Sequence, residues 1–447
     1  MKIRKIISLI IAVVLMLTCS GCALNFFSVE SLMNPPLQSG KNGEVQAAFN
    51  EIMKDKIVQL KTPVSGEYQS SFVLFDINGD EVDEAMVFYS DSSVEGSVRM
   101  ALLECIDEKW FLASDVKGAG SGVFDISFND MNNDGTDEVF VSWSLYDSKT
   151  TRIVSVYQAV TDKNNRFTLE SLGNEYCSSK SFADFNGDRK SDMVLVYLDD
   201  TKDIQKSFLR LFSLSENNEL VKYGELLLDS AITSVAAIQC DTIRSGDNSY
   251  KRLFIDCQKN DRIIFTEMVY WDIDISTPVR AIKEPAVSTA RSSKVLCRDI
   301  DSDGNMEIPV ITGLQGDEKQ LSVTDYDTVY TFTLLDWLNV YGDGSLKKVQ
   351  TLLNPLDMYL LKFPWNGDIS VKYDAERNEL VFCEWSVTRK TMGDKLFSIA
   401  FREKTDESYN NVLYEYEDGI YYYDITESGE SYGITEDELK ASFIKIN

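Results

Sequence analysis

The sequence predicts an all-β fold, a β-propeller of about seven blades whose hairpin loops bind metal. Three observations support this prediction. A nine-residue acidic loop occurs four times, short runs rich in Val, Phe and Tyr flank each copy, and the first three copies start 54 residues apart. A strand-only repeat of this length is typical of a propeller, in which each blade is one small antiparallel sheet. The chain from residue 66 onward has room for about seven such repeats.

Each acidic loop carries an oxygen-bearing side chain at its positions 1, 3, 5 and 9. Oxygen ligands at alternating positions of a tight turn suit Ca²⁺, which takes six to eight oxygens in a flexible cage. The sequence therefore predicts four calcium sites. Their candidate ligands, loop by loop, are Asp76, Asn78, Asp80 and Glu84; Asp130, Asn132, Asp134 and Glu138; Asp184, Asn186, Asp188 and Asp192; and Asp299, Asp301, Asp303 and Glu307.

The loops do not match the EF-hand, another common calcium loop. An EF-hand places a bidentate Glu at position 12 and is flanked by helices. Position 12 here is Val87, Val141, Leu195 or Val310, each inside a predicted strand. A single copy of such a loop is equally well read as an ordinary Asp/Asn/Gly turn, but four copies with one oxygen spacing favour metal binding. We expect each loop to join two strands of a hairpin and to hold calcium as a structural ion.

These loops resemble FG-GAP or VCBS repeats, the repeats of integrin-α-like β-propellers, whose loop reads Asp-x-Asp/Asn-x-Asp-Gly-x-x-Asp/Glu. The recognisable copies cover residues 76–90, 130–143, 184–198 and 299–311. The whole chain is similar to VCBS-repeat lipoproteins of Gram-positive bacteria. The resemblance implies that each loop joins strands of one blade and lies away from the face that usually binds ligands.

The N-terminus, residues 1–21, reads as a lipoprotein signal peptide. A basic start is followed by an apolar run, residues 6–17, which is too short to span a membrane. The following Cys19-Ser-Gly-Cys22 looks like a lipobox, although Cys19 stands where Leu is usual. A lipobox implies a diacylglyceryl group on Cys22, and two acyl chains suffice for stable anchoring at the outer face of the cell membrane. Plain secretion is the alternative.

The remainder of the chain divides into three predicted parts. Residues 22–42 are expected to form a tether, residues 43–62 an amphipathic helix that packs on the rim, and residues 63–447 the propeller. Two further strand–loop–strand units that lack the oxygen spacing are expected at about 235–256 and 371–385.

Composition limits the possible functions. With 72 acidic and 44 basic side chains, the net charge of −28 disfavours nucleic acid as a partner. The chain has no histidine, which excludes Ser-His-Asp and Cys-His catalysis. We therefore expect a binding or protein-interaction module, not an enzyme, with an unknown protein or glycan ligand. An extracellular polysaccharide hydrolase or lyase that uses funnel carboxylates is the alternative, and a structural factor of the cell envelope is a third possibility.

Six cysteines lie beyond the lipobox, at irregular spacing. Most of them occur in apolar strand contexts, so buried free thiols are expected, with Cys240 and Cys257 the first pair to check for a disulfide.

Overall fold

The computed structural model describes residues 40–446 with several internal gaps. Those gaps are residues 93–97, 162–166, 200–205, 246–247, 293, 313–331, 341–345, 356–358, 363–367, 405–410 and 416–418. The predicted signal peptide, most of the tether and Cys22 lie outside the described residues. Among the described helices, none is long and apolar enough to cross a membrane.

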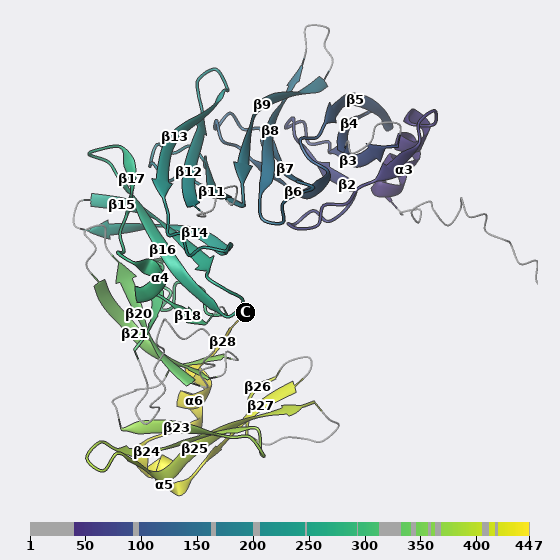
Figure 1. Ribbon diagram of the computed structural model, residues 1–447. Coiled ribbons are helices and arrows are strands. Elements are labelled where there is room, and N and C mark those ends of the chain that lie inside the picture. Colours follow the sequence, from purple (N-terminus) through teal and green to yellow (C-terminus); the bar gives the residue numbers. More distant parts are fainter. Residues whose placement is uncertain are drawn as a thin grey trace, which may run out of the picture.

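The described chain is mostly β and forms six antiparallel sheets of four or five strands, which follow one another in sequence order along an arc (Figure 1). This confirms the predicted all-β, propeller-type architecture. Sheets 1 to 3 contain β1 (Val58–Leu60), β2 (Phe72–Phe75), β3 (Glu84–Asp91), β4 (Val98–Ile106) and β5 (Lys109–Lys117); β6 (Gly122–Asn129), β7 (Glu138–Ser144), β8 (Arg152–Thr161) and β9 (Phe167–Cys177); and β10 (Ser179–Ala183), β11 (Asp192–Asp199), β12 (Lys206–Leu214) and β13 (Leu220–Leu227).

The last three sheets are less regular. They contain β14 (Ser234–Ser245), β15 (Asn248–Gln258), β16 (Ile263–Asp272), β17 (Thr277–Arg280) and β18 (Arg291–Ser292); β19 (Ile308–Ile311), β20 (Phe332–Val340), β21 (Leu346–Pro355), β22 (Tyr359–Leu361) and β28 (Phe443–Lys445); and β23 (Ile369–Asp374), β24 (Glu379–Ser386), β25 (Thr391–Glu403), β26 (Val412–Glu415) and β27 (Gly419–Ile425). The six sheets of the described residues are one fewer than the predicted seven. The repeat lengthens after β17, where the short helix α4 (Pro285–Ser288), β18 and the fourth acidic loop precede β19.

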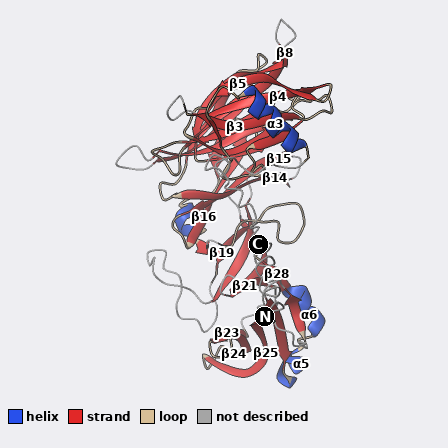
Figure 2. Cartoon of the chain, turned by 90° about the vertical axis from the view of Figure 1, so that its right-hand side faces the viewer, coloured by secondary structure: helices blue, strands red, loops and turns tan. Residues whose placement is uncertain are grey.

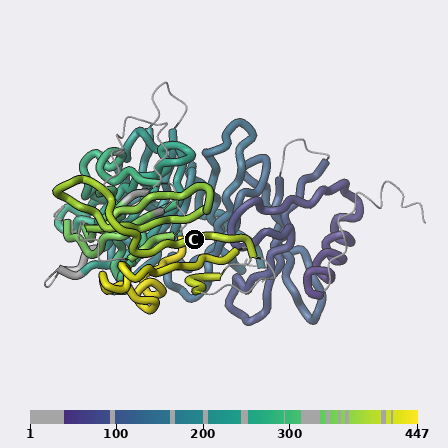
Figure 3. Tube along the Cα trace, turned by 90° about the horizontal axis from the view of Figure 1, so that it is seen from below, coloured from purple at the N-terminus to yellow at the C-terminus, as the bar shows by residue number. Residues whose placement is uncertain are grey.

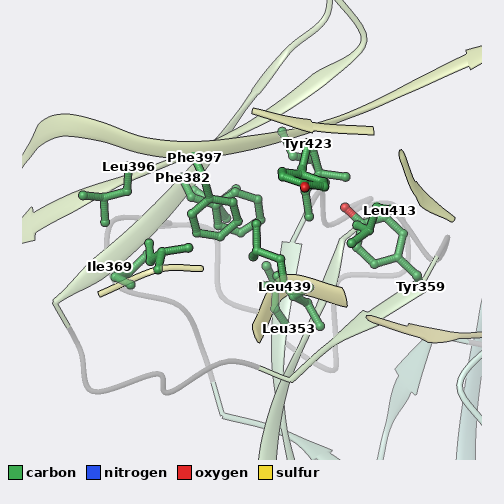
Figure 4. Packing of buried hydrophobic residues seen from close by; sticks show 14 of the residues in the cluster. Leu353, Tyr359, Ile369, Phe382, Leu396, Phe397, Leu413, Tyr423 and Leu439 are labelled. Carbon is green, nitrogen blue, oxygen red and sulfur yellow. The ribbon is translucent and has the colours of Figure 1, made fainter. Parts of the chain in front are cut away.

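Neighbouring sheets pack face to face through buried apolar side chains. The second strands β3, β7 and β11 read as continuous apolar runs because side chains on both of their faces are buried. Between the first two sheets, Phe88 meets Trp143 edge to face at 6.1 Å. Figure 4 shows the cluster that joins the fifth and sixth sheets, in which Phe382 stacks on Phe397 at 4.2 Å and Leu439 fills the gap between the sheets.

Helix α3 (Lys41–Ile52) covers the free face of the first sheet (Figure 2). Phe49 is buried there against Tyr89 at 5.3 Å. A stack of repeats needs such a cap, because its terminal apolar face has no neighbouring repeat to cover it.

The predicted helix over residues 43–62 is too long. The helix ends at Ile52, Ile57 is 79% exposed, and Val58–Leu60 is instead strand β1 on the edge of β3. The polar Lys54-Asp-Lys56 segment interrupts the apolar stripe, and the backbone groups of β3 offer ladder hydrogen bonds in place of helical ones.

Two C-terminal helices, α5 (Glu427–Tyr432) and α6 (Glu436–Ser442), were not predicted from the sequence. A capping box begins α6, with Thr435 and Glu438 bonded reciprocally. The following strand β28 pairs with β22, so the C-terminal chain returns to the fifth sheet. Figure 3 shows this yellow segment beside the green strands.

Candidate metal centres

The acidic loops occupy equivalent places in the sheets. The first three connect β2 to β3, β6 to β7 and β10 to β11, each time two antiparallel strands that pair with each other in one sheet. The fourth leads from the bridge between Arg298 and Glu307 into β19. The fourth sheet has the predicted hairpin of β14 and β15 without an acidic loop.

All four loops share one hydrogen-bond scheme. The carboxylate at position 1 accepts backbone N–H bonds from the turn ahead of it: Asp76 accepts from Gly79 and Glu81, each at 2.8 Å, and Asp299 accepts from Gly304 at 2.8 Å. Asp130 accepts from Asn133 at 2.6 Å and Asp184 from Gly187 at 2.8 Å, in both loops the N–H of position 4. The carboxylate at position 5 then accepts from the N–H of position 7 at 2.8 to 2.9 Å in every loop.

Each loop also bends twice through the left-handed backbone region. Positions 4 and 6 have positive φ, and one of the two is glycine each time, which avoids half of the steric cost. The pairs are Gly79 and Glu81, Asn133 and Gly135, Gly187 and Arg189, and Ser302 and Gly304. The fourfold repetition of bonds and dihedral signs indicates one conserved loop geometry within this chain, not four unrelated turns.

The acid at position 9 is buried in every loop. Glu84, Glu138, Asp192 and Glu307 are at most 1% exposed, and each accepts the N–H of position 2 at 2.8 to 3.2 Å. Burial raises the pKa of Glu84, Glu138 and Glu307 to about 7 and that of Asp192 to about 6. A buried carboxylate beside other carboxylates ionises readily only when a cation balances it.

The fourth loop brings its acids closest together. One carboxylate oxygen from each of Asp299, Asp301 and Glu307 lies within 4.8 Å of the other two. Calcium–oxygen bonds measure about 2.3–2.6 Å, so one ion can contact all three. The residues present therefore fit a hard divalent cation.

In the other three loops, an asparagine at position 3 separates the acids. Asn132 Nδ2 donates to Asp134 and to Glu138 at 2.9 and 3.0 Å, and Asn78 makes the same two contacts with Asp80 and Glu84 at 3.2 Å. The amide NH₂ thus lies among the carboxylates, and a cation would require the amide oxygen there instead. In the third loop Asn186 donates to Asp188, and Lys251 lies 3.6 Å from Asp184.

A buried network links the fourth loop to the fourth sheet. Arg252 on β15 is fully buried, pairs with Asp241 and donates to Asn339 Oδ1 at 2.7 Å. Asn339 in turn donates to Glu307 Oε1 at 3.2 Å, and Asp241 accepts from Met306 N at 2.7 Å. This network was not predicted from the sequence, although an arginine directly before the apolar run of β15 was a usable signal.

The six cysteines of the described residues are free thiols. Cys240 lies opposite Leu253 and Cys257 opposite Val235, so the pair considered for a disulfide is not in register. Cys240 is exposed, and burial raises the pKa of Cys177 to about 12.

The buried position-9 acids predict an unusual pH dependence for the metal-free protein. The three Glu side chains among them have a folded-state pKa of about 7 but ionise near 4.5 when unfolded. Folding therefore takes up protons in this window, and the free energy of unfolding falls as pH rises through it. Urea unfolding in chelator at about pH 5, 6 and 7.5 measures this slope, and Glu138→Gln should flatten it. A metal-free stability that rises with pH over this window, in both proteins alike, contradicts the prediction.

No family model and no curated protein matches the sequence. Among solved structures, the chain is similar to the periplasmic gluconolactonase PpgL of Pseudomonas aeruginosa, with a TM-score of 0.27, 12% identity, and coverage of 76% of this chain and 88% of that one. It is also similar to a putative 6-phosphogluconolactonase of Bacteroides fragilis, with a TM-score of 0.24, 11% identity, and coverage of 75% and 92%.

Proposed function

We propose that this protein is a calcium-stabilised β-propeller that acts as a binding module, held on the outer face of the cell membrane by a lipid on Cys22. One observation carries the proposal: the four acidic loops repeat the bonds accepted at positions 5 and 9, the same positive-φ positions and the same buried acid at position 9. In this proposal the chain belongs with the FG-GAP or VCBS repeat proteins that its loops resemble.

Calcium is the proposed ion because the donors are all oxygen. Carboxylate and amide oxygens suit hard cations, and the loops offer no cysteine thiolate or imidazole for zinc. The ion is proposed as structural. Three of the loops are hairpin connections, the fourth leads from the Arg298–Glu307 bridge into β19, and the last acid of each is buried at or next to the start of a strand. A bound ion would therefore tie together the chain on the two sides of the loop. Asp299, Asp301, Asp303 and Glu307 would hold the best-defined ion.

Equilibrium dialysis of the full-length protein in detergent tests the proposed calcium sites. We expect about four calcium ions per chain, because four loops share one geometry. The fourth loop should fill first because oxygens of three of its acids already lie within 4.8 Å of one another. Asp261→Asn, at an exposed acid outside the loops, is the matched control and should leave the count unchanged. A count of zero or one contradicts the proposal.

The proposed anchor is tested separately. Changing Cys22 to Ala removes the sulfur that would carry the lipid, so the variant should be released into the medium or accumulate as an unprocessed precursor. Cell fractionation with mass spectrometry measures both outcomes. A Cys22→Ala protein that stays in the membrane fraction with normal mature mass refutes the anchor. Cys240→Ala, at an exposed cysteine on β14, serves as the control.

The alternative, a polysaccharide hydrolase or lyase, requires two carboxylates that converge away from the acidic loops. Three cavities bear on this requirement. Their acids are Asp301 and Glu438 in one of about 860 Å³, Asp301 and Asp303 in one of about 650 Å³, and Asp125 in one of about 370 Å³. None of these three meets the requirement, so a binding function is the proposal that we retain.

A further inference from the structure

A cavity of about 370 Å³ lies at the end of the sheets remote from the acidic loops. Its walls come from the strands that lead three successive sheets: Asp125 on β6, Ser179 and Lys180 on β10, and Ser234 on β14, with Ser65 from the segment before β2. Asp125 precedes the second loop by five residues, which is about 16 Å of strand. We call this space the basic cavity.

The basic cavity is positively charged within a strongly acidic protein. Lys149, Arg152 and Lys180 line it, against a single acid, Asp125. The chain as a whole carries −28. Charges farther away than about 8–10 Å are screened at ordinary salt concentrations, so the local cations dominate inside the cavity. Because Lys180 pairs with Asp125, the lining leaves Lys149 and Arg152 without a balancing acid inside the cavity.

The cations are held in place by the surrounding chain. Lys180 Nζ pairs with Asp125 and donates to Ser142 Oγ at 3.0 Å. The Arg152 guanidinium lies 3.4 Å over the Phe124 ring, and its Nη1 donates to the Ser178 carbonyl oxygen. Because that bond leaves from Nη1, Nε and Nη2 can still donate to a ligand. Pre-ordered groups lose little entropy on binding.

The lining favours one ligand class. A guanidinium fork matches a carboxylate, and the exposed Lys149 at the rim adds a second cation. Ser65, Ser179 and Asp125 offer hydroxyl and carboxylate groups that suit the hydroxyls of a sugar. Neutral sugars usually stack on an open aromatic face, but Arg152 already covers Phe124. The volume lies in the range of small-molecule sites.

We propose that the basic cavity binds a small sugar acid, with Arg152 and Lys149 on the carboxylate and the serines and Asp125 on the hydroxyls. This inference rests on the proposed binding function and names its ligand class. It needs no calcium at the cavity, since the acidic loops lie at the other end of the strands.

The test is isothermal titration of the calcium-loaded full-length protein with D-glucuronate. We expect saturable binding of one molecule per chain, at least tenfold weaker in Lys149→Glu and in Arg152→Gln. Lys149 is exposed, so its variant should fold normally even if Arg152→Gln does not. Lys109→Glu, at an exposed position on β5, reverses a charge elsewhere and should bind like the wild type.

Glucose and sulfate are the competing ligands. Weak or absent glucose binding supports the sugar acid, whereas sulfate bound as tightly as glucuronate overturns it in favour of an inorganic anion site. Absent glucuronate binding, or equal binding by Lys149→Glu, also overturns the inference. Calcium content, measured on the same samples, separates the two proposals. Four bound ions without glucuronate binding refute only the proposal that the basic cavity binds a sugar acid. A folded protein with no calcium refutes the proposal that calcium stabilises the propeller.

Discussion

Chelating calcium is expected to lower the melting temperature of this protein by a large amount. An ion that binds only the folded state stabilises it by RT ln(1 + [L]/Kd), about 2.7 kcal/mol per site when free calcium is 100-fold above Kd. With four loops of one geometry, the losses should add over the sites. The metal-free loops also leave three buried Glu side chains and Asp192 without a compensating cation.

Asp303→Ala isolates the fourth site. Asp303 accepts the Asn305 N–H at 2.8 Å and holds position 5 of the loop, so the variant should lose one calcium ion and only part of the chelator effect. Thermal unfolding with calcium and with chelator, for the wild type and Asp303→Ala, measures both losses, and Asp261→Asn is the control. An unchanged wild-type melting temperature after chelation refutes the structural assignment.

The sequence predicted the repeated hairpins well because the determinants are local. Alternating oxygens, a glycine at a positive-φ position and flanking apolar runs all lie within about 15 residues, and three of the four loops form connections between strands of one sheet as expected. The degenerate hairpin at β14 and β15 and the hairpin of β23 and β24 were also predicted. Because the strand–loop–strand unit occurs several times in the chain, each copy of its sequence pattern supports the prediction of the others.

The missed features depend on contacts distant in sequence. The end of α3 is decided by the edge of β3, which takes Val58–Leu60 into a ladder. The return of β28 to β22 joins residues more than 80 positions apart. Glu307 was predicted from its loop, but its partner Asn339 and the buried Arg252 are visible only once the fourth and fifth sheets pack together.

Arg252→Met is expected to destabilise the protein strongly, by about 3–5 kcal/mol, which is typical when one partner of a buried ion pair is removed. Both partners of the pair are buried: the side chain of Arg252 is 0% exposed, and that of Asp241 is 6% exposed. Methionine retains much of the volume but leaves the Asp241 charge buried. It also removes the bonds to Asn339 Oδ1 and to the Val340 carbonyl oxygen, each 2.7 Å long.

Urea unfolding of Arg252→Met in calcium measures this loss, with Arg262→Met, at an exposed arginine, as the control that should change stability little. The double variant Arg252→Met, Asp241→Asn tests whether the unpaired Asp241 charge causes the loss, because removing that buried charge should recover part of the stability. The network also ends on Glu307, so the fourth site should bind calcium more weakly in Arg252→Met while the first site is unaffected. A single variant that unfolds at the same urea concentration as the wild type contradicts the assignment of Arg252 as the residue that ties the fourth loop to the fourth sheet.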